Sequence, residues 1–280
     1  MPELPEVETV CRGLSKALLG LRIAAITVNR KGLRIPFPAR LPEMAGARVE
    51  SIDRRAKYIL IRLNNAETMI VHLGMSGRMT ITPRAETYSP EKHDHMLIKM
   101  QDGTQVVFND ARRFGLVDLV ASNALGDHKL FQHLGPEPLE KGFDAAYLAE
   151  KLKDKKVAIK LAIMDQTVVV GVGNIYASEA LFRAGISPRR RAKTLKKPEI
   201  AKLIAAIHKV LNDAIKAGGS SLRDYVQADG ELGYFQHHWA VYDKAGAKCP
   251  GCSCDIGKTG GIRKMTQGAR STFYCPRKQK

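Results

Sequence analysis

The chain of 280 residues lacks long apolar runs. No apolar stretch reaches the roughly 18 residues that a membrane-spanning helix needs. Neither a signal peptide nor a basic amphipathic anchor is evident. Internal repeats and low-complexity tracts are also missing. These absences argue against a membrane protein, and we expect an intracellular one.

Cysteine is scarce and unevenly distributed. Five cysteines occur, and Cys11 falls on the apolar face of a predicted helix. In a reducing compartment, a cluster of the remaining four near the C-terminus indicates a metal site rather than disulfides. The surrounding segment is too small for a hydrophobic core of its own, so it needs a metal or a docking surface. The clustered residues are Cys249, Cys252, Cys254 and Cys275.

Acidic residues are few relative to basic ones. The chain has 28 Asp and Glu against 45 Lys and Arg, which gives a formal net charge of +17. This excess predicts a polyanionic partner, and nucleic acid is the leading candidate. The apolar content of 44% and the charged content of 26% are otherwise ordinary for a soluble globular protein.

Two hydrophobic patterns divide the chain. Short alternating runs after Gly20 predict antiparallel strands, with a strong hairpin signal at Asp102-Gly103. We expect a β-sandwich with the N-terminal helix laid against it. After the proline-rich break at residues 135–138, helical periodicity takes over. The predicted fold class is therefore α+β, in segments 1–134, 135–239 and 240–280.

The first ten residues, MPELPEVETV, place a proline beside two carboxylates. If Met1 is removed, Pro2 presents a secondary α-amine that can attack an electrophilic carbon and form an iminium ion. An α-amine with a pKa near 7.7 to 8 is roughly a tenth neutral at pH 7, far more than lysine; proline's somewhat higher basicity narrows this advantage. Glu3 and Glu6 fall on one side of the first helical turn. On residue chemistry alone, the preferred interpretation is that Pro5 and the two glutamates merely start an ordinary amphipathic helix.

The whole stretch, with Pro2, Glu3, Pro5, Glu6 and Thr9 in place, resembles the N-terminal signature of the formamidopyrimidine-DNA glycosylase family. The resemblance implies a base excision repair enzyme that excises oxidised purines, such as 8-oxoguanine and formamidopyrimidines, and nicks the strand by β,δ-elimination. It implies Pro2 as the nucleophile, Glu3 as general acid and base, and Glu6 as an orienting group, with no cofactor for catalysis. We expect a monomer that binds damaged double-stranded DNA in the cytoplasm, associated with the nucleoid.

Two alternatives stay open. The endonuclease VIII branch applies the same Pro2 and Glu3 chemistry to oxidised pyrimidines, but the run LPEVET matches the purine branch better. A non-catalytic damaged-DNA-binding protein would keep the scaffold without activity, and the intact Pro2, Glu3 and Lys57 argue against it.

Further stretches carry residues to which the resemblance assigns roles. Lys57 in RRAKYIL, by itself an ordinary solvated strand lysine, matches a lysine that assists β-elimination. Met75 in HLGMSGR, with Arg112 and Phe114 in NDARRFG, matches the trio that fills the space left by an extruded base. By themselves these runs indicate a buried methionine and a solvated hairpin corner. Ala111 stands where the family usually has proline, so we expect a less rigid loop.

A second set of residues is expected to contact DNA. His93 and His95 in KHDHM would share one face of a strand, but no third metal ligand is near, and the resemblance implies a phosphate contact for His93. Lys155 and Lys160, at a helix edge that is otherwise a solubilising face, match lysines that touch DNA. Leu161 after Lys160 replaces a common proline.

The run DQTVVVGVGNIYASEALFRAGISP resembles the family's helix-two-turn-helix motif, with Asn174 as a phosphate ligand and Glu179 as a structural partner. Downstream, the run GGSSLRDYVQADGELGYFQHHWAVY resembles the family's mobile loop over the extruded base. This run continues into the C-terminal segment 240–280, which we call the finger.

The C-terminal segment departs from the family's zinc ribbon. Its first CxxC pair is present as Cys249 and Cys252, but Lys278 stands where the fourth thiolate belongs, and an ammonium is a poor zinc ligand. We expect one structural zinc with Cys254 and Cys275 completing the set, although three ligands on one knuckle strain the geometry.

The competing prediction is a finger without zinc, held by packing of Ile262, Phe273 and Tyr274. In either case the resemblance implies that Arg270 holds the phosphates that flank the lesion during elimination.

Overall fold

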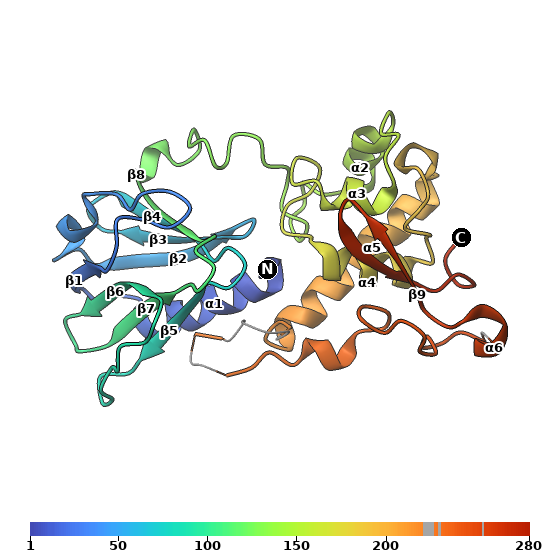
Figure 1. Ribbon diagram of the computed structural model, residues 1–280. Coiled ribbons are helices and arrows are strands. Elements are labelled where there is room, and N and C mark those ends of the chain that lie inside the picture. The colour runs from blue at the N-terminus through green and yellow to red at the C-terminus, as the bar shows by residue number, and fades with distance from the viewer. Residues whose placement is uncertain (221–226, 229–230, 254) are drawn as a thin grey trace. The chain divides into compact units, whose positions relative to one another are not determined.

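The computed structural model describes residues 1–220, 227–228, 231–253 and 255–280. The chain forms two compact units (Figure 1). The first contains Met1–Gln132 and Ile215–Gln236, and the second contains His133–Ala214 and His237–Lys280. None of the helices within these described ranges is long and apolar enough to cross a membrane.

The two units divide the chain differently from the three expected segments. The stretch after the longest helix returns to the first unit, where Ser220 N–H donates to Glu6 and Ile81 N–H donates to the Ala228 carbonyl at 2.7 Å. The C-terminal finger forms part of the second unit. These long-range contacts are absent from the local patterns on which the expected boundaries were based.

Two four-stranded antiparallel sheets build the first unit. One has the order β2-β3-β4-β8, with β2 at Val49–Arg55, β3 at Tyr58–Leu63, β4 at Glu67–His72 and β8 at Leu116–Ala121. The other has the order β1-β6-β7-β5, with β1 at Ile23–Val28, β6 at Asp94–Met100, β7 at Gln105–Asn109 and β5 at Arg78–Thr82. Helix α1 spans Leu4–Leu18, and short 3-10 turns span Leu41–Met44 and Ser122–Ala124.

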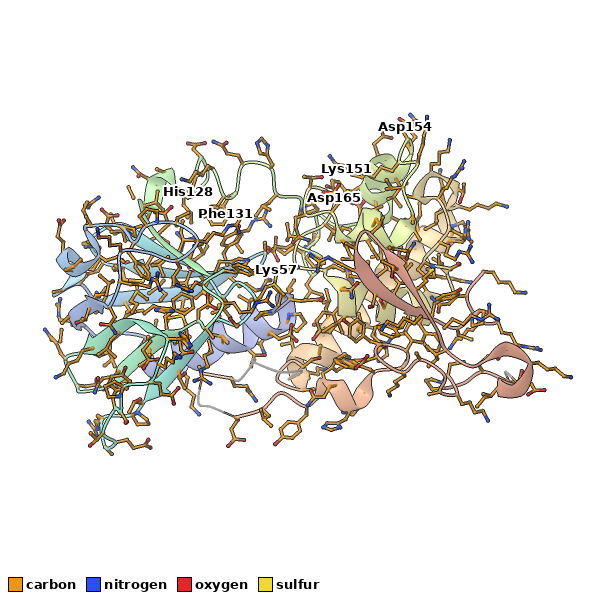
Figure 2. All side chains as sticks on the ribbon, in the orientation of Figure 1. Lys57, His128, Phe131, Lys151, Asp154 and Asp165 are labelled. Carbon is orange, nitrogen blue, oxygen red and sulfur yellow. The ribbon has the colours of Figure 1, made fainter. Side chains whose placement is uncertain are left out.

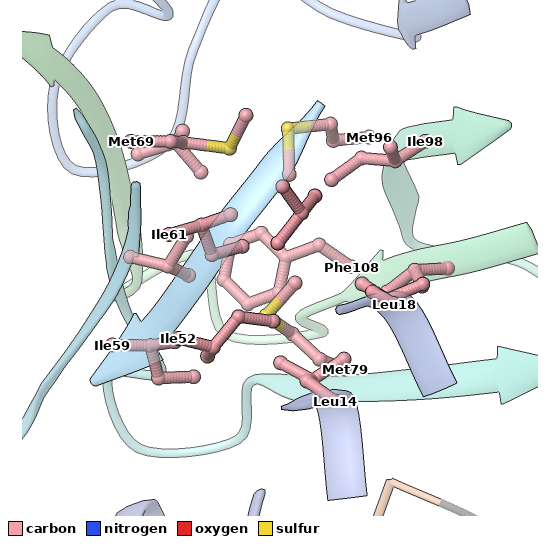
Figure 3. Close-up of a cluster of buried hydrophobic side chains, with 14 of the residues drawn as sticks. Leu14, Leu18, Ile52, Ile59, Ile61, Met69, Met79, Met96, Ile98 and Phe108 are labelled. Atoms are coloured by element: carbon pink, nitrogen blue, oxygen red, sulfur yellow. The ribbon is translucent and has the colours of Figure 1, made fainter. Parts of the chain in front are cut away.

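One hydrophobic core joins α1 to both sheets, which confirms the predicted sandwich and its helix. Figure 3 shows Phe108 of β7 among side chains of α1, β3 and β6. The face of α1 that its periodicity predicted is fully buried, including Val7, Val10 and Leu14. The predicted hairpin at Asp102 is also present, because Thr104 N–H donates to the Asp102 carboxylate at 2.9 Å in the turn between β6 and β7.

Helices and one hairpin build the second unit. The helices are α2 at Ala145–Leu152, α3 at Ile159–Met164, α4 at Asn174–Ala184, α5 at Lys197–Lys216, whose last two residues belong to the first unit, and α6 at Ile256–Thr259. The hairpin pairs β9 at Arg263–Gln267 with β10 at Arg270–Tyr274. A further 3-10 turn spans Ala192–Thr194, and another spans Phe235–His238, whose first two residues belong to the first unit.

Candidate functional site

The start of α1 holds the predicted catalytic carboxylates below the surface. Pro2, Glu3 and Glu6 are all buried, whereas Met1 before them is exposed. The Glu3 backbone N–H donates to Glu6 Oε2 at 2.8 Å, and Ser220 N–H donates to Glu6 Oε1 at 2.8 Å. Because both oxygens of Glu6 accept from backbone groups, its geometry suits an orienting role.

Lys57 lies in the turn between β2 and β3 (Figure 2). The residue is only 7% exposed, so the simple alternative of a solvated strand lysine is wrong. The preceding Ala56 has φ 54°, a left-handed conformation that is uncommon for a residue with a Cβ. The Arg54 guanidinium holds this turn, donating to the Ala56 carbonyl at 3.0 Å and to Glu8 of α1 at 3.1 Å. Through Arg54, the turn of Lys57 is tied to the helix whose start holds Glu3 and Glu6.

His72, at the end of β4, is a titratable group near Lys57 that sequence reasoning missed. Its ring centroid lies 4.9 Å from that of Tyr58, and its Nδ1 accepts from Gly74 N–H at 2.9 Å. The pKa of His72 is lowered to about 4, mainly by burial and also by the positive charges of Lys57 and Arg34. The imidazole is therefore neutral near pH 7, with its proton on Nε2. A single histidine at a strand end carries no sequence signal that sets it apart from a packed core residue.

Met75, Arg112 and Phe114 are exposed on two adjoining loops, residues 73–77 after β4 and residues 110–115 after β7. Phe114 is 48% exposed and Met75 is 36% exposed, although both side chains are large and apolar. The Arg112 guanidinium carbon lies 5.0 Å from the centre of the Phe114 ring, within cation–π range. The alternative of a buried methionine is therefore wrong. Two large apolar side chains, Met75 and Phe114, exposed on adjoining loops indicate an interaction site.

The two histidines of KHDHM have different environments. His95 is 5% exposed, and its Nε2 lies 2.9 Å from the carbonyl oxygen of Asp110. His93 is partly exposed with φ 77°, and the two ring centroids are 6.2 Å apart. Within the ranges that the structure describes, the group of three or more close metal-ligating side chains lies elsewhere, in the cysteine cluster. The phosphate contact of His93 stays a prediction.

In the second unit, Lys160 and Asn174 share one hydrogen-bond network with the hairpin. Lys160 Nζ donates to Asn174 Oδ1 at 2.6 Å, to Thr272 Oγ1 at 2.7 Å and to the Ser271 carbonyl at 3.2 Å. Asn174 Nδ2 donates to the same carbonyl at 2.9 Å. Lys160 is 0% exposed, so the expectation of a lysine on a solvated helix edge is wrong for it; its contact with DNA stays a prediction. The buried ammonium is stabilised by three acceptors and holds α3, α4 and β10 together.

The hydrogen bonds of Glu179 confirm the structural role expected for this residue. This fully buried residue of α4 accepts from three consecutive backbone N–H groups. The donors, each at 2.9 Å, are Ala240, Val241 and Tyr242. Its carboxylate therefore fixes the segment that leads into the finger.

The other two predicted DNA-contacting residues of this unit lie at its surface. Lys155 is partly exposed, and its Nζ lies 3.1 Å from the Asp165 carboxylate. Arg270 is exposed at the first position of β10. The preceding turn, Gly268-Ala269, has φ values of 55° and 57°, as a tight hairpin turn requires. Of the predicted mobile loop, residues 221–226 and 229–230 lie outside the described residues.

Three cysteine sulfurs converge at the base of the finger. The Sγ atoms of Cys249, Cys252 and Cys275 all lie within 4.8 Å of one another, with Cys249 to Cys275 at 3.2 Å and Cys252 to Cys275 at 3.8 Å. Four sulfurs about 2.3 Å from a tetrahedral zinc would be separated by about 3.8 Å, so the three fit a metal site of this kind. The Lys278 ammonium lies 4.2 Å from the centre of the Phe182 ring, which agrees with its exclusion as a ligand. Cys254, the predicted fourth ligand, lies outside the described residues.

The apolar packing that would hold a finger without zinc is also present. Ile262 and Phe273 belong to a buried cluster that includes Cys249 and Cys275, and Tyr274 is 8% exposed. The finger thus has both apolar packing and a sulfur cluster, and neither excludes the other.

Comparisons with known proteins agree with this arrangement. The family model described as the formamidopyrimidine-DNA glycosylase N-terminal domain matches residues 1–117, and the one described as its H2TH domain matches residues 134–226. The formamidopyrimidine-DNA glycosylase of Rhodospirillum rubrum is 52% identical over 281 residues, and that of Ruegeria pomeroyi is 49% identical over 287 residues. Both alignments cover 100% of each chain.

Solved structures give the same result. A Lactococcus lactis Fpg mutant in complex with DNA containing Fapy-dG has a TM-score of 0.90 at 34% identity, covering 99% of both chains. The MutM (Fpg) protein of Thermus thermophilus has a TM-score of 0.87 at 35% identity, covering 99% of this chain and 98% of that one. With two family models and full-length relatives in agreement, the chain belongs to the formamidopyrimidine-DNA glycosylase family.

Proposed function

We propose that this DNA repair glycosylase is bifunctional, with AP lyase activity, and that it removes oxidised purines from duplex DNA. The observation that carries the proposal is the joint placement of Pro2 and Glu3, buried at the start of α1, with Lys57 in a turn that Arg54 ties to the same helix. Family membership supports the glycosylase activity. Among the similar structures, Lactococcus lactis Fpg is complexed with DNA containing an abasic site.

Removal of Met1 would convert the Pro2 nitrogen from an amide to a nucleophilic secondary amine. The neutral amine attacks C1′ of the damaged nucleotide and a C1′–N bond forms. The bond from C1′ to the base breaks; the base leaves with the electron pair and takes up a proton, while the proline nitrogen loses its N–H proton. Cleavage of the bond from C1′ to the ring oxygen then gives the iminium. Glu3 transfers the proton that sugar-ring opening requires. Glu6 orients Glu3 through the hydrogen bond from the Glu3 N–H.

Strand cleavage then proceeds from the same covalent intermediate. The iminium at C1′ acidifies the C2′ proton, and loss of that proton expels the 3′ phosphate in β-elimination. A second elimination expels the 5′ phosphate, and water hydrolyses the iminium to release Pro2. Lys57 assists the proton transfers, and the buried position of this residue removes competing solvent from the step.

The surface residues of each unit supply the proposed contacts with damaged duplex DNA. Met75, Arg112 and Phe114 fill the space left by the extruded base, and Arg112 contacts the base opposite the lesion. His93 and Lys155 contact phosphates.

Asn174 and Arg270 complete the phosphate contacts in the second unit. Lys160 orients Asn174 through the hydrogen bond to its Oδ1. This buried lysine therefore supports DNA binding through Asn174 without being exposed itself. The net charge of +17 supports a polyanionic partner. We propose that the protein acts as a monomer.

A structural zinc fits the finger. Cys249, Cys252 and Cys275 would hold it with Cys254 as the fourth ligand, and the ion would stabilise the fold without taking part in the reaction. The hairpin that presents Arg270 is the element that depends on this support.

Borohydride trapping tests the reaction and its substrate together. Purified protein would be incubated with duplexes that carry 8-oxoguanine, a formamidopyrimidine or an oxidised pyrimidine, with Glu3→Gln as the matched variant. We expect covalent complexes with the two purine lesions and loss of lesion excision in Glu3→Gln. Preferential trapping on the pyrimidine lesion would instead support the endonuclease VIII alternative, and no trapping on any duplex would refute the proposal.

A further inference from the structure

A fully buried carboxylate that the proposed mechanism does not use lies beside the exposed Met75 and Phe114. Asp110, the residue after β7, is 0% exposed. A buried carboxylate is unfavourable unless its oxygens accept hydrogen bonds. The hydrogen-bond donors to the Asp110 carboxylate therefore indicate its structural role.

Each oxygen of Asp110 accepts from a different loop. Oδ1 accepts from Ser76 Oγ at 2.5 Å, and Oδ2 accepts from Gly115 N–H at 2.8 Å. Ser76 Oγ in turn accepts from Arg112 N–H at 3.0 Å. The backbone carbonyl oxygen of Asp110 also lies 2.9 Å from His95 Nε2. The loop of Met75 and the loop of Arg112 and Phe114 are thus joined through one carboxylate.

The two loops also approach each other too closely for an added methyl group. A Cβ on Gly74 would lie 2.4 Å from the Phe114 carbonyl carbon and 2.4 Å from the Gly115 nitrogen. Gly74 moreover has φ +65°. The backbones of the two loops are therefore in direct contact at this point, and the hydrogen bonds of Asp110 add a second link beside it.

We propose that Asp110 is a positioning residue that holds Met75 and Phe114 at a fixed separation, ready to enter the base stack as one wedge. This inference rests on the proposed role of these two side chains in lesion extrusion. Without the carboxylate, the Ser76 hydroxyl and the Gly115 N–H lose their common acceptor, and the separation of the two loops is held less firmly. Extrusion of the damaged base should then slow, while the chemistry at Pro2 continues.

Single-turnover excision separates these two effects. For Asp110→Ala we expect excision of 8-oxoguanine from a duplex to slow about tenfold or more, since the wedge acts only when a stack is opened. Borohydride trapping on a single-stranded oligonucleotide with an abasic site needs no stack opening, and we expect it to stay within about twofold of the unmodified protein. Fluorescence of 2-aminopurine next to the lesion should rise more slowly in the variant.

Conservative variants and a matched control keep the inference falsifiable. Asp110→Asn retains one acceptor and should recover part of the rate. Ser76→Ala removes both the donor to Asp110 and the acceptor of the Arg112 N–H, and it should slow duplex excision if Asp110→Ala does not fold. Thr68→Val alters another fully buried residue of the same unit, whose Oγ1 lies 2.7 Å from Ser122 Oγ, and should leave excision unchanged at equal thermal stability.

A double variant provides the last test. If Asp110 acts through the wedge, Asp110→Ala combined with Phe114→Ala should excise no more slowly than Phe114→Ala alone. Additive losses, or equal losses on the duplex and the single strand, would overturn the inference. If the unmodified protein itself failed to excise 8-oxoguanine, the proposed function would fall instead, so the two failures are distinguishable.

Discussion

Pro2 is the residue on which the proposed chemistry depends most directly. Pro2→Gly replaces a secondary amine held by its ring with a primary amine on a freely rotating residue. We expect the borohydride-trapped complex to fall at least about a hundredfold, because small displacements of a reacting group cost this much. Binding of lesion DNA should stay within about tenfold, since phosphate contacts dominate affinity. Acetylation of the N-terminus is the matched test, and a normal trapping yield in either protein would refute the nucleophile assignment.

His72 should make folding stability depend on pH. Its pKa is lowered from 6.5 to about 4 in the folded chain, so the unfolded chain takes up this proton first as the pH falls. The contribution of neutral His72 is fully present above pH 6.5 and is lost as the pH falls to about 4. In His72→Gln, the free energy of unfolding measured with urea should decline less steeply across this window.

The exposed His133 supplies the control for this measurement. His133→Gln should show the same pH slope as the unmodified protein. A slope unchanged by His72→Gln would mean that the imidazole is not held neutral in the folded state.

At the scale of elements, Lys160 joins α3 and α4 to the hairpin strand β10. Lys160→Met keeps the length of the side chain but leaves the acceptors Asn174 Oδ1 and Thr272 Oγ1 without their donor. We expect a loss of about 1 to 3 kcal/mol in the free energy of unfolding, the cost of leaving buried polar groups unpaired. The exposed Lys156→Met is the control and should cost little. Equal stability of the two variants would contradict the network's role.

The finger is the second element whose stability can be tested. Metal analysis of freshly purified protein should find one zinc, and treatment with a chelator should lower the thermal stability of the second unit, because metal binding is coupled to folding in small segments. Cys254→Ser should lose most of the zinc. Near-zero zinc in the untreated protein, or full retention by the variant, would favour the finger held by Ile262 and Phe273 alone.

At the scale of the whole molecule, part of the excess of basic residues is concentrated in two segments of the second unit. Residues 151–158 and 187–199 carry ten basic side chains against two acidic ones. The two segments run side by side, since Lys193 N–H donates to the Lys155 carbonyl at 3.0 Å. Three exposed residues of these segments, Lys153, Arg191 and Lys193, can be neutralised by replacement with glutamine. For binding to undamaged duplex, the slope of log K against log salt concentration should then become less steep by about 0.9 per lost phosphate contact.

A triple variant with the same change in charge checks this prediction. Replacing the exposed Lys129, Lys141 and Lys202 by glutamine should change the salt dependence less. If both triple variants change the slope equally, total charge rather than this paired basic region determines binding.

Local patterns predicted much of the fold. The helical period of Val7, Val10 and Leu14 predicted α1, and Asp102-Gly103 predicted the hairpin between β6 and β7, because helix faces and tight turns depend on neighbours only a few residues away. The family was likewise recognisable from short contiguous motifs. The cysteine spacing predicted the convergence of three sulfurs but not the position of Lys278 over Phe182.

The sequence by itself determined which groups the proposed chemistry would use, because a proline, two glutamates and their spacing lie within the first six residues. Only the tertiary structure decided which polar groups hold that chemistry in place. Asp110 meets Ser76 across 34 residues, Lys160 meets Thr272 across 112, and Glu6 meets Ser220 across 214. Such pairings depend on how sheets and helices pack rather than on periodicity, so a buried lysine and a surface lysine are alike in sequence and differ only in the folded chain.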